Sequence, residues 1–245
     1  MLAVPGELPA AGEDGRWAYE LKWDGVRAIG YVQDGTTRLM SRNDLDVSVS
    51  YAEVLEPPEG LRRRSAVLDV ELVALDERGR PSFGRLQERM HVRDQAAVRR
   101  LSGRVPVLYY VFDLLRLDDR PLLQLPYTER RALLEDLELD TTTWRVPPSF
   151  SGPAADVMAA SAQHGLEGIV AKRRASTYRP GQRSPDWRKV KHQRMQEVII
   201  AGWRPGKGRR TNRIGSLILA VPDRRGNLQH VGGVGTGFTE RMRLA

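Results

Sequence analysis

The chain has no cysteine and only four histidines among its 245 residues. Disulfide bonds and thiolate metal sites are therefore excluded. The histidines are too scattered along the sequence to suggest a zinc site; they are His91, His164, His192 and His230. Any metal that the chain binds is expected to be a hard ion such as Mg²⁺, held by carboxylates and phosphates.

Long apolar runs are also missing. No stretch approaches the length of a membrane span, and the chain does not open with a basic segment followed by an apolar one. We therefore expect a cytoplasmic protein with no membrane contact. The 40% of hydrophobic residues is sufficient for a core that fills one large domain or two smaller ones.

Acidic residues are outnumbered by basic ones. Lys and Arg number 39 against 31 Asp and Glu, which gives a net charge of +8 and an isoelectric point near 10.1. A domain this basic suits a polyanion, and nucleic acid is the commonest one. A general compositional preference for arginine is the alternative, so charge favours nucleic acid without establishing it.

A lysine stands in an unusual setting near the start of the chain. Residues 17–22 alternate in polarity as a half-buried strand does, and residues 26–32 continue the pattern. Asp24 and Gly25 between them predict a tight turn, which places Lys22 where the backbone can approach a ligand closely. Such a lysine is a candidate nucleophile if burial or neighbouring cations favour its neutral form. The alternative is a surface hairpin with a solvated lysine.

Two carboxylates lie on a strongly apolar predicted strand, residues 65–76. Asp69 and Glu71 are two positions apart, so they point to the same face of the strand. Metal or ribose binding is one explanation for acidic residues in this setting. An ion pair with a core arginine is the other.

The remaining pattern predicts an alternation of strands and helices. Residues 1–16 are rich in Pro, Gly and Ala and predict a flexible lead-in or surface strap. Asp34-Gly35 predicts a hairpin turn, and Gly165 is expected to end a helix. Helices are predicted over residues 82–91, 94–101, 127–137 and 153–164, and strands over 105–115 and 166–172.

A predicted strand at residues 187–191 puts Lys189 and Lys191 on one face. Lysines clustered in this way repel one another unless an anion lies between them. Composition then shifts near residue 195. Three short strands, predicted over residues 197–204, 214–221 and 227–234, indicate the start of a small antiparallel barrel.

Six short motifs occur in a fixed order along the chain. They are Lys22-Trp-Asp24-Gly25-Val-Arg27, Ser41-Arg42-Asn43, Leu68-Asp69-Val-Glu71, Val111-Phe112-Asp113-Leu-Leu, Glu167-Gly168-Ile-Val-Ala-Lys172 and Trp187-Arg-Lys189-Val-Lys191. In this order the chain resembles the ATP-dependent DNA ligases of the covalent nucleotidyltransferase superfamily, and most closely the ligase domain of bacterial end-joining ligases. The resemblance runs from about residue 17 to residue 238.

This resemblance implies a fold, an activity and partners. The fold is α+β: a nucleotidyltransferase (ATP-grasp-like) domain of antiparallel sheets flanked by helices over residues 1–194, followed by a partial OB-fold β-barrel over residues 195–245. The activity is the sealing of nicks in double-stranded DNA through a lysyl-AMP, with ATP and Mg²⁺ or Mn²⁺, in repair and end joining. Implied partners are nicked DNA, an end-binding protein and fused or separate polymerase and nuclease domains, in the cytoplasm at the bacterial nucleoid.

The resemblance also implies residues that bind the nucleotide. Lys22 attacks the α-phosphate of ATP, and Glu20 helps to select adenine. Phe112 stacks on the base. Glu71 is expected to contact the ribose, directly or through the metal. Lys189 and Lys191 are expected to contact the α-phosphate, and Lys172 is also expected to contact the nucleotide.

Metal and DNA contacts are implied in the same way. Glu167 is expected to bind the metal. Glu71 is expected to bind it too if Glu71 holds the ribose through that ion. Arg42 holds the 5′-phosphate of the nick and Arg27 its 3′-hydroxyl. Asp24 lies near that hydroxyl in the last step.

The chain departs from the family pattern in three places. Asp44 follows Ser41-Arg42-Asn43 where the family usually has Gly, and Val70 replaces the usual Gly within Leu68-Asp69-Val-Glu71. The chain also stops at Ala245. The family has a further C-terminal motif, beyond the six found here, and additional strands of the barrel that would follow this position. We expect either a fragment of a longer protein or a shortened enzyme impaired in lysine adenylation.

Three alternatives remain at this point. Two are an RNA ligase and an mRNA-capping guanylyltransferase of the same superfamily. The third is a truncated, non-catalytic module that binds nicks. NAD-dependent ligases are disfavoured because they carry a cysteine zinc module.

Overall fold

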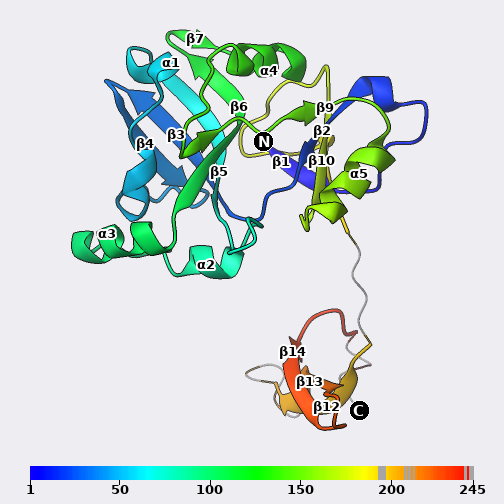
Figure 1. The fold of residues 1–245 in the computed structure, drawn as a ribbon. Helices are drawn as coiled ribbons and strands as arrows, with labels where there is room; N and C mark the ends of the chain where they lie inside the picture. Colours follow the sequence, from blue (N-terminus) through cyan, green and yellow to red (C-terminus); the bar gives the residue numbers. More distant parts are fainter. Residues whose placement is uncertain (193–196, 207, 209–210, 212, 240–241, 243–245) are drawn as a thin grey trace. The chain divides into compact units, whose positions relative to one another are not determined.

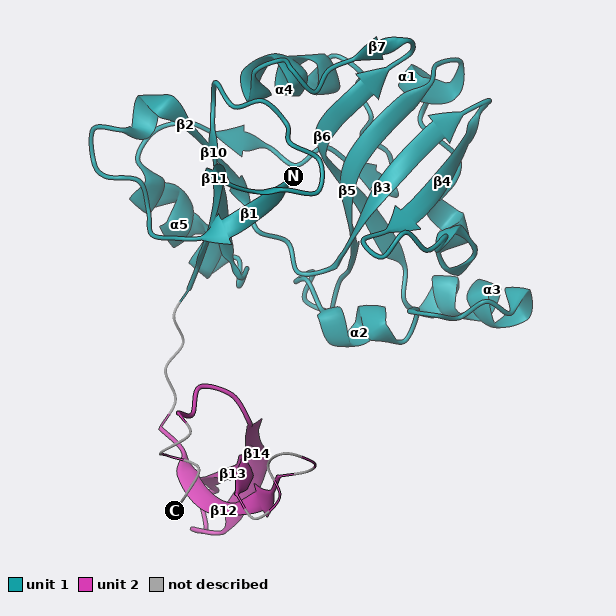
Figure 2. Ribbon diagram, turned by 180° about the vertical axis from the view of Figure 1, so that it is seen from behind, with its two compact units in different colours: residues 1–192 teal, residues 193–245 magenta. Residues whose placement is uncertain are grey.

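The protein is represented by a computed structural model that describes residues 1–192, 197–206, 208, 211, 213–239 and 242. The chain divides into two compact units, Met1–His192 and Gln193–Ala245, coloured separately in Figure 2. Within the described ranges, no helix combines the length and apolarity needed to cross a membrane.

The larger sheet of the first unit is antiparallel apart from one short strand. Its path runs β4-β3-β5-β6-β7, and β8 pairs with β6 in parallel (Figure 1). The strands are β3 (Val26–Gln33), β4 (Thr36–Ser41), β5 (Ala66–Ala74), β6 (Val107–Leu117), β7 (Arg120–Pro121) and β8 (Trp144–Arg145). The predicted hairpin at Asp34-Gly35 is confirmed, since these residues join β3 to β4.

One face of this sheet carries the main hydrophobic core. Leu68, Val70 and Leu72 of β5 are fully buried there, and each such side chain contributes roughly 1.5–3 kcal/mol when it leaves water. The helical segments of this part of the chain are η2 (Ser48–Val54), α1 (Glu59–Arg62), α2 (Phe83–Gln87), α3 (Gln95–Arg104) and α4 (Tyr127–Glu135).

The helix predicted over residues 82–91 is wrong in length, because α2 ends at Gln87. Arg89 follows it and turns inward to pair with Glu53, with Nη1 2.6 Å from Oε1. The buried ion pair fixes the backbone in a turn where the sequence pattern alone predicts helix.

The second sheet of this unit has the order β1-β11-β10-β2-β9. Its strands are β1 (Leu2–Pro5), β2 (Trp17–Leu21), β9 (Ser149–Phe150), β10 (Gly168–Arg173) and β11 (Arg183–Lys191), and η1 (Asp14–Arg16) and α5 (Ala154–Gln163) accompany it. Trp17, Tyr19 and Ile169 are fully buried and form its core with α5. Gly165 follows α5 with φ +67°, as predicted for a helix end.

The prediction of a flexible lead-in is wrong for the first residues. β1 pairs in parallel with β11, and Met1 is buried against Tyr178 and Trp187. These residues are apolar, and the free edge of β11 provides partners for their backbone groups. The Pro-Gly-Ala composition concealed both features.

The prediction of a turn at Asp24-Gly25 within one continued strand pair is also wrong. β2 belongs to the smaller sheet and β3 to the larger one, so residues 22–25 cross from one sheet to the other. Gly25 is required at this crossing because a Cβ atom there would lie 2.1 Å from the carbonyl oxygen of Leu72. The crossing places Lys22 between two sheets rather than at a hairpin tip.

The second unit contains a three-stranded antiparallel sheet, β12-β13-β14. Its strands, β12 (Ile199–Pro205), β13 (Ile214–Pro222) and β14 (Leu228–Val234), correspond to the three predicted ones. The resemblance also implies that a helix begins over residues 239–245, and of these the structure describes only Thr239 and Met242. That these strands belong to an OB-fold stays a prediction.

Candidate active site

A pocket of about 230 Å³ lies between the two sheets of the first unit. Strands of both sheets contribute to its walls, so side chains far apart in the sequence meet there. Its lining is Leu2, Ala3, Glu20, Leu21, Lys22, Trp23, Arg27, Arg42, Glu71, Phe112, Pro147, Val170, Lys172, Arg183, Trp187 and Lys189.

Lys22 is held at this pocket by its backbone and by its amine. Its backbone N–H donates to the carbonyl oxygen of Gly168 at 2.9 Å, and its Nζ pairs with Oε2 of Glu167. Lys191 pairs with the other oxygen of the same carboxylate. Burial raises the pKa of Glu167, but hydrogen bonds from Lys191 and Lys22 outweigh it and hold that pKa below its ordinary value. Glu167 is therefore an anion shared by Lys22 and Lys191, and it is not paired with Lys189.

The glycine after Glu167 sets this geometry. Gly168 has φ +149°, and a Cβ atom there would lie 2.0 Å from the carbonyl oxygen of Val190. Only glycine allows β10 to approach β11 this closely. The Glu-Gly pair of the sequence therefore brings the carboxylate within reach of both lysines.

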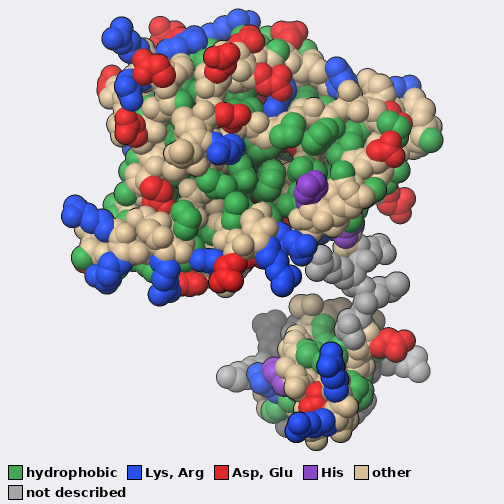
Figure 3. Space-filling model, viewed as in Figure 1, with side chains coloured by type: hydrophobic (Ala, Val, Ile, Leu, Met, Phe, Trp, Pro, Cys, Tyr) green, Lys and Arg blue, Asp and Glu red, His purple; other side chains and the backbone are tan. Residues whose placement is uncertain are grey.

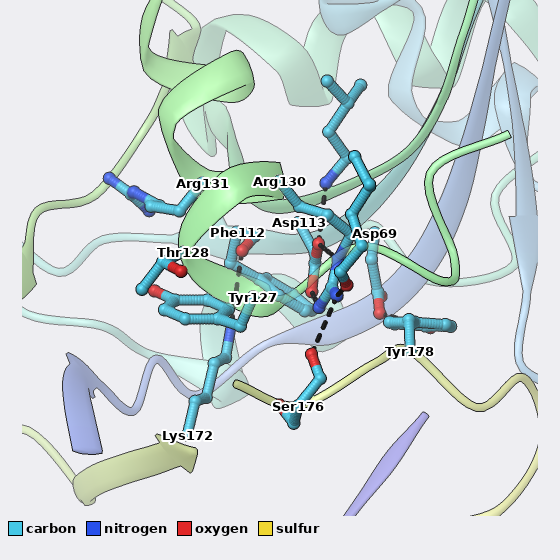
Figure 4. Close-up of polar contacts among 12 residues, drawn as sticks. Asp69, Phe112, Asp113, Tyr127, Thr128, Arg130, Arg131, Lys172, Ser176 and Tyr178 are labelled. Atoms are coloured by element: carbon cyan, nitrogen blue, oxygen red, sulfur yellow. Dashed lines mark hydrogen bonds and ion pairs between the residues drawn. The ribbon is translucent and has the colours of Figure 1, made fainter. Parts of the chain in front are cut away.

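The buried side chain of Lys172 and the rings of Phe112 and Trp187 line one wall of the pocket, here called its inner wall, and the ring of Tyr127 lies against the same lysine. The Nζ atom of Lys172 lies 2.7 Å from Oε1 of Glu20 and 4.9, 4.9 and 4.3 Å from the ring centroids of Phe112, Tyr127 and Trp187. Burial lowers the pKa of Lys172, and Glu20 partly offsets that effect. Figure 4 shows Lys172, Tyr127 and Phe112 close together.

The same carboxylate is fixed from a second direction. The hydroxyl of Tyr127 donates to Oε1 of Glu20 at 2.6 Å, and burial together with Glu20 raises the pKa of Tyr127 well above its ordinary value. Glu20 is thus held rigidly beside apolar ring faces. This combination suits a flat heteroaromatic ring with hydrogen-bonding edges.

Asp69 is paired with an arginine, as the second of the two sequence interpretations predicts. Its carboxylate accepts from Arg27 at 2.8 and 2.5 Å and from the hydroxyl of Tyr178 at 2.7 Å. Arg27 also donates to the backbone oxygen of Met1 at 2.5 Å. The side chain of Arg27 stays 27% exposed, so this pairing leaves part of the guanidinium open to the pocket.

Glu71 lies on the same strand face and differs from Asp69 in its surroundings. Burial raises its pKa to about 8, although Arg27 and Lys22 act in the opposite direction. A carboxylate destabilised in this way gains from a cation or a hydroxyl donor placed in the pocket.

Asp113 and Arg130 form a buried ion pair next to Phe112. The guanidinium Nε and Nη2 donate to the two carboxylate oxygens at 2.8 and 2.9 Å, and Nη1 donates to the backbone oxygens of Leu125 and Ser176 (Figure 4). Every oxygen and most donors are satisfied, so this pair fixes the backbone that carries Phe112.

The structure brings most of the predicted site residues together. Glu20, Lys22, Arg27, Arg42, Glu71, Phe112, Lys172 and Lys189 line the pocket. Glu167 and Lys191 are joined to Lys22 directly and by the shared carboxylate. Asp24 is exposed and is absent from the lining, although its charge acts on Glu71.

Sequence reasoning missed several lining residues. Trp187 is buried beside Lys172, and its position two residues before Lys189 could have placed it on the same strand face. Arg183 and the β1 residues Leu2 and Ala3 carried no such signal. Their place in the lining depends on the pairing of β1 with β11.

No group of three or more acidic or histidine side chains that could hold a metal occurs among the residues that the structure describes. Glu167 contacts the Nζ atom of Lys22, and the charge of Lys22 also acts on Glu71. Mg²⁺ is usually bound by one or two carboxylates together with phosphate oxygens and water. The donor set therefore fits a divalent ion that arrives with a phosphorylated ligand.

Comparison with known proteins gives consistent matches. The family described as "ATP dependent DNA ligase domain" matches residues 2–191. The chain is 43% identical over 242 residues to the "Multifunctional non-homologous end joining protein LigD" of Mycobacterium bovis, covering 98% of this chain and 30% of that protein. It is 38% identical to the Pseudomonas aeruginosa LigD over 97% of this chain and 27% of that one. The chain thus spans 30% and 27% of the length of these two relatives.

A solved structure agrees over the same extent. "Mycobacterial DNA ligase D complexed with ATP and MES" matches with a TM-score of 0.69 and 41% identity, over 98% of this chain and 73% of that one. The predicted α+β class with mostly antiparallel sheets is confirmed by this match and by the observed sheets.

Proposed function

The chain belongs to the ATP-dependent DNA ligase family, and from that premise we propose that it seals nicks in duplex DNA through an AMP group carried on Lys22. The proposed adenylation domain is residues 1–194. Residues 195–245 are proposed as part of an OB-fold. ATP is the proposed nucleotide, in keeping with the mycobacterial relative whose structure was solved in complex with ATP.

Lysine adenylation is the first step. The neutral Nζ of Lys22 attacks the α-phosphorus, a P–N bond forms, and the bond to pyrophosphate breaks. Glu167 contacts Nζ and is placed to receive or relay the proton that Nζ loses. Lys189 and Lys191 are the proposed partners of the negative charge that develops on the phosphoryl oxygens.

We propose that the adenine binds against the inner wall of the pocket. Phe112 offers a ring face for stacking. Glu20 offers an acceptor edge for the exocyclic amine, held in place by Lys172 and Tyr127. Trp187 closes the wall behind Lys172.

A divalent ion, Mg²⁺ or Mn²⁺, is proposed to bind Glu71 and Glu167 with the nucleotide phosphates. When bound, it would supply charge stabilisation to those phosphates. Glu71 is also proposed to hold the ribose. Its place in the pocket lining, opposite Arg27 on the neighbouring strand, supports either partner, and burial there raises its pKa.

Transfer to DNA completes the reaction. AMP moves from Lys22 to the 5′-phosphate of the nick, and the 3′-hydroxyl then attacks that phosphorus and expels AMP. Arg42 is proposed to hold the 5′-phosphate and Arg27 the 3′ end, with Asp24 near the attacking hydroxyl. The names of the LigD relatives support a role in end joining, with an end-binding protein and polymerase or nuclease domains as proposed partners.

The single observation that carries this proposal is the contact of Lys22 with Glu167 at the mouth of a pocket whose inner wall holds Glu20 and Lys172 under aromatic rings. Sealing of a fluorescent nicked duplex with ATP, with GTP and with no nucleotide tests it. We expect ATP-dependent sealing of nicked DNA and none with GTP. Preference for GTP or for nicked RNA would instead support the capping or RNA-ligase alternatives. Binding of nicked DNA with no sealing of an already adenylated nick would support the non-catalytic module.

A further inference from the structure

The pocket-side face of the larger sheet continues well beyond the pocket. Alternation along β3 places Arg27 and Tyr31 on the same face. Arg27 pairs across the sheet with Glu71 at the pocket, and Tyr31 pairs with Arg38 on one side and Val67 on the other. Figure 2 shows the strands β6, β5, β3 and β4 side by side, turned toward the viewer.

The outermost part of this face carries two arginines and a tyrosine. Val67 pairs in turn with Arg116, so Arg38, Tyr31, Val67 and Arg116 form one row across four strands, here named the outer row. Tyr31 is 39% exposed, and both arginines are exposed. The guanidinium carbon of Arg38 lies 5.4 Å from the centroid of the Tyr31 ring, and Arg116 donates to Ser65 Oγ at 3.3 Å.

Two acidic groups that interact electrostatically with the arginines of the outer row also have other partners. Asp118 acts on Arg116 but accepts from Arg64 at 3.0 and 2.7 Å. Asp46 acts on Arg38 but accepts a backbone N–H at 2.9 Å. The outer row itself contains no carboxylate, so it presents two guanidinium groups and an exposed aromatic ring, with Arg38 beside that ring. This chemistry is complementary to a polyanion with flat or sugar surfaces.

The distance from the pocket defines which part of the ligand would reach the outer row. Tyr31 lies four residues beyond Arg27 on one strand, which is about 13 Å at ~3.3 Å per residue. A DNA strand advances ~3.4 Å per nucleotide. We propose that the outer row binds the sugar–phosphate backbone of duplex DNA roughly four nucleotides from the nick, a proposal that rests on the proposed ligase function.

Removal of the two arginines tests this directly. The double variant Arg38→Ser/Arg116→Ser is compared with the unaltered chain in binding to a nicked duplex over a range of salt concentrations. Each lost phosphate contact reduces the slope of log affinity against log salt by ~0.9, so we expect a reduction of about two. The duplex is also shortened on one side of the nick at a time, so that this arm is shorter than the roughly four nucleotides proposed above. We expect the unaltered chain to bind more weakly when one particular arm is shortened and equally well when the other is. The double variant loses less on that arm.

A matched control removes the same charge elsewhere. Arg99→Ser/Arg100→Ser on α3 also eliminates two exposed arginines, and Figure 3 shows Lys and Arg side chains gathered over α3. We expect the control to keep the salt slope of the unaltered chain. Equal slopes for the chain and the outer-row variant, or an equal loss in the control, would overturn the proposal. So would a change in self-association with no change in DNA binding, which would assign the row to contact between copies.

Transfer of AMP to the protein separates the two claims. The outer-row variant is expected to form the covalent adenylate as well as the unaltered chain does. Adenylation with no slope change in the outer-row variant would reject the surface and leave the ligase function standing. Absence of adenylate from the unaltered chain would reject the ligase function itself.

Discussion

At the residue scale, the site depends on how each charge is compensated. Glu167 is shared by Lys22 and Lys191, Glu20 is paired with Lys172, and Lys189 lines the pocket without a pair described for it. Because no carboxylate of the described residues is paired with it, the Lys189 side chain is available to bind the negative charge of a phosphorylated ligand.

Replacement of Lys189 by Ala should lower the rate of adenylation by about 10²-fold, because one donor to the developing phosphoryl charge is lost. Single-turnover labelling from ATP measures this rate. Arg188→Ala is the matched control, since Arg188 lies on the other face of β11 with its guanidinium carbon 4.6 Å from the Trp17 ring centroid. Equal losses in both variants would argue against a phosphate contact by Lys189.

Glu71 should make stability depend on pH. Burial raises its pKa to about 8 from the ordinary 4.5, so the folded state binds a proton that the unfolded state has released. The free energy of unfolding therefore falls as the pH rises between these two values. Urea unfolding without nucleotide or divalent ion should show this fall in the unaltered chain and a smaller one in Glu71→Gln. An equal dependence of the unfolding free energy on pH in the unaltered chain and in Glu71→Gln would contradict the assignment of this effect to Glu71.

The residues of the site were largely predictable, because their motifs combine unusual residue types at fixed spacing. The role of Asp69 was not. The sequence left open a ligand contact or an ion pair, and the choice depended on β3 lying next to β5 so that Arg27 reaches it. The sequence of neither strand indicates which strand it pairs with.

At the scale of single elements, Gly25 and Gly168 allow the close backbone approaches on which the site depends. Gly168 lets β10 pack against β11 and so places Glu167. Gly168→Ala should destabilise the chain by about 3 kcal/mol and reduce adenylation more than its effect on folding explains. Gly84→Ala in α2, where a Cβ atom would meet nothing within 4 Å, should be nearly neutral. Thermal unfolding and labelling of both variants test this, and a tolerated Gly168→Ala would refute it.

The longer strands and the helices α2 to α5 were predicted from hydrophobic periodicity, and the bounds agree closely for β12, β13 and β14. The strands β1, β7, β8 and β9 were not predicted. The failures came from tertiary partners. β1 forms because the edge of β11 accepts it, and α2 stops early because Arg89 turns toward Glu53. Local composition contains neither partner.

At the scale of the whole molecule, every residue that lines the pocket lies in the first unit. Residues 1–192 expressed alone should therefore still bind ATP. At roughly 100 times the dissociation constant, ATP should add about 2.7 kcal/mol to the free energy of unfolding of both the full chain and this shorter one. Nucleotide-dependent stabilisation seen only in the full chain would mean that the second unit completes the site.

The chain divides into the compact units Met1–His192 and Gln193–Ala245, and the assignment of an adenylation domain and an OB-fold domain stays a prediction. What the sequence could not provide is the arrangement of the first unit as two sheets with the pocket between them. Residues 17–32 looked like a single strand pair, and only the crossing at residues 22–25 reveals the second sheet.

The most direct test of the account is covalent labelling of the protein. The chain and Lys22→Ala are incubated with α-³²P-ATP and Mg²⁺ or Mn²⁺, then separated on a denaturing gel. The account predicts a labelled band for the chain that is absent from Lys22→Ala. Absence of label from both proteins, or equal label in both, would contradict the assignment of Lys22 as the nucleophile.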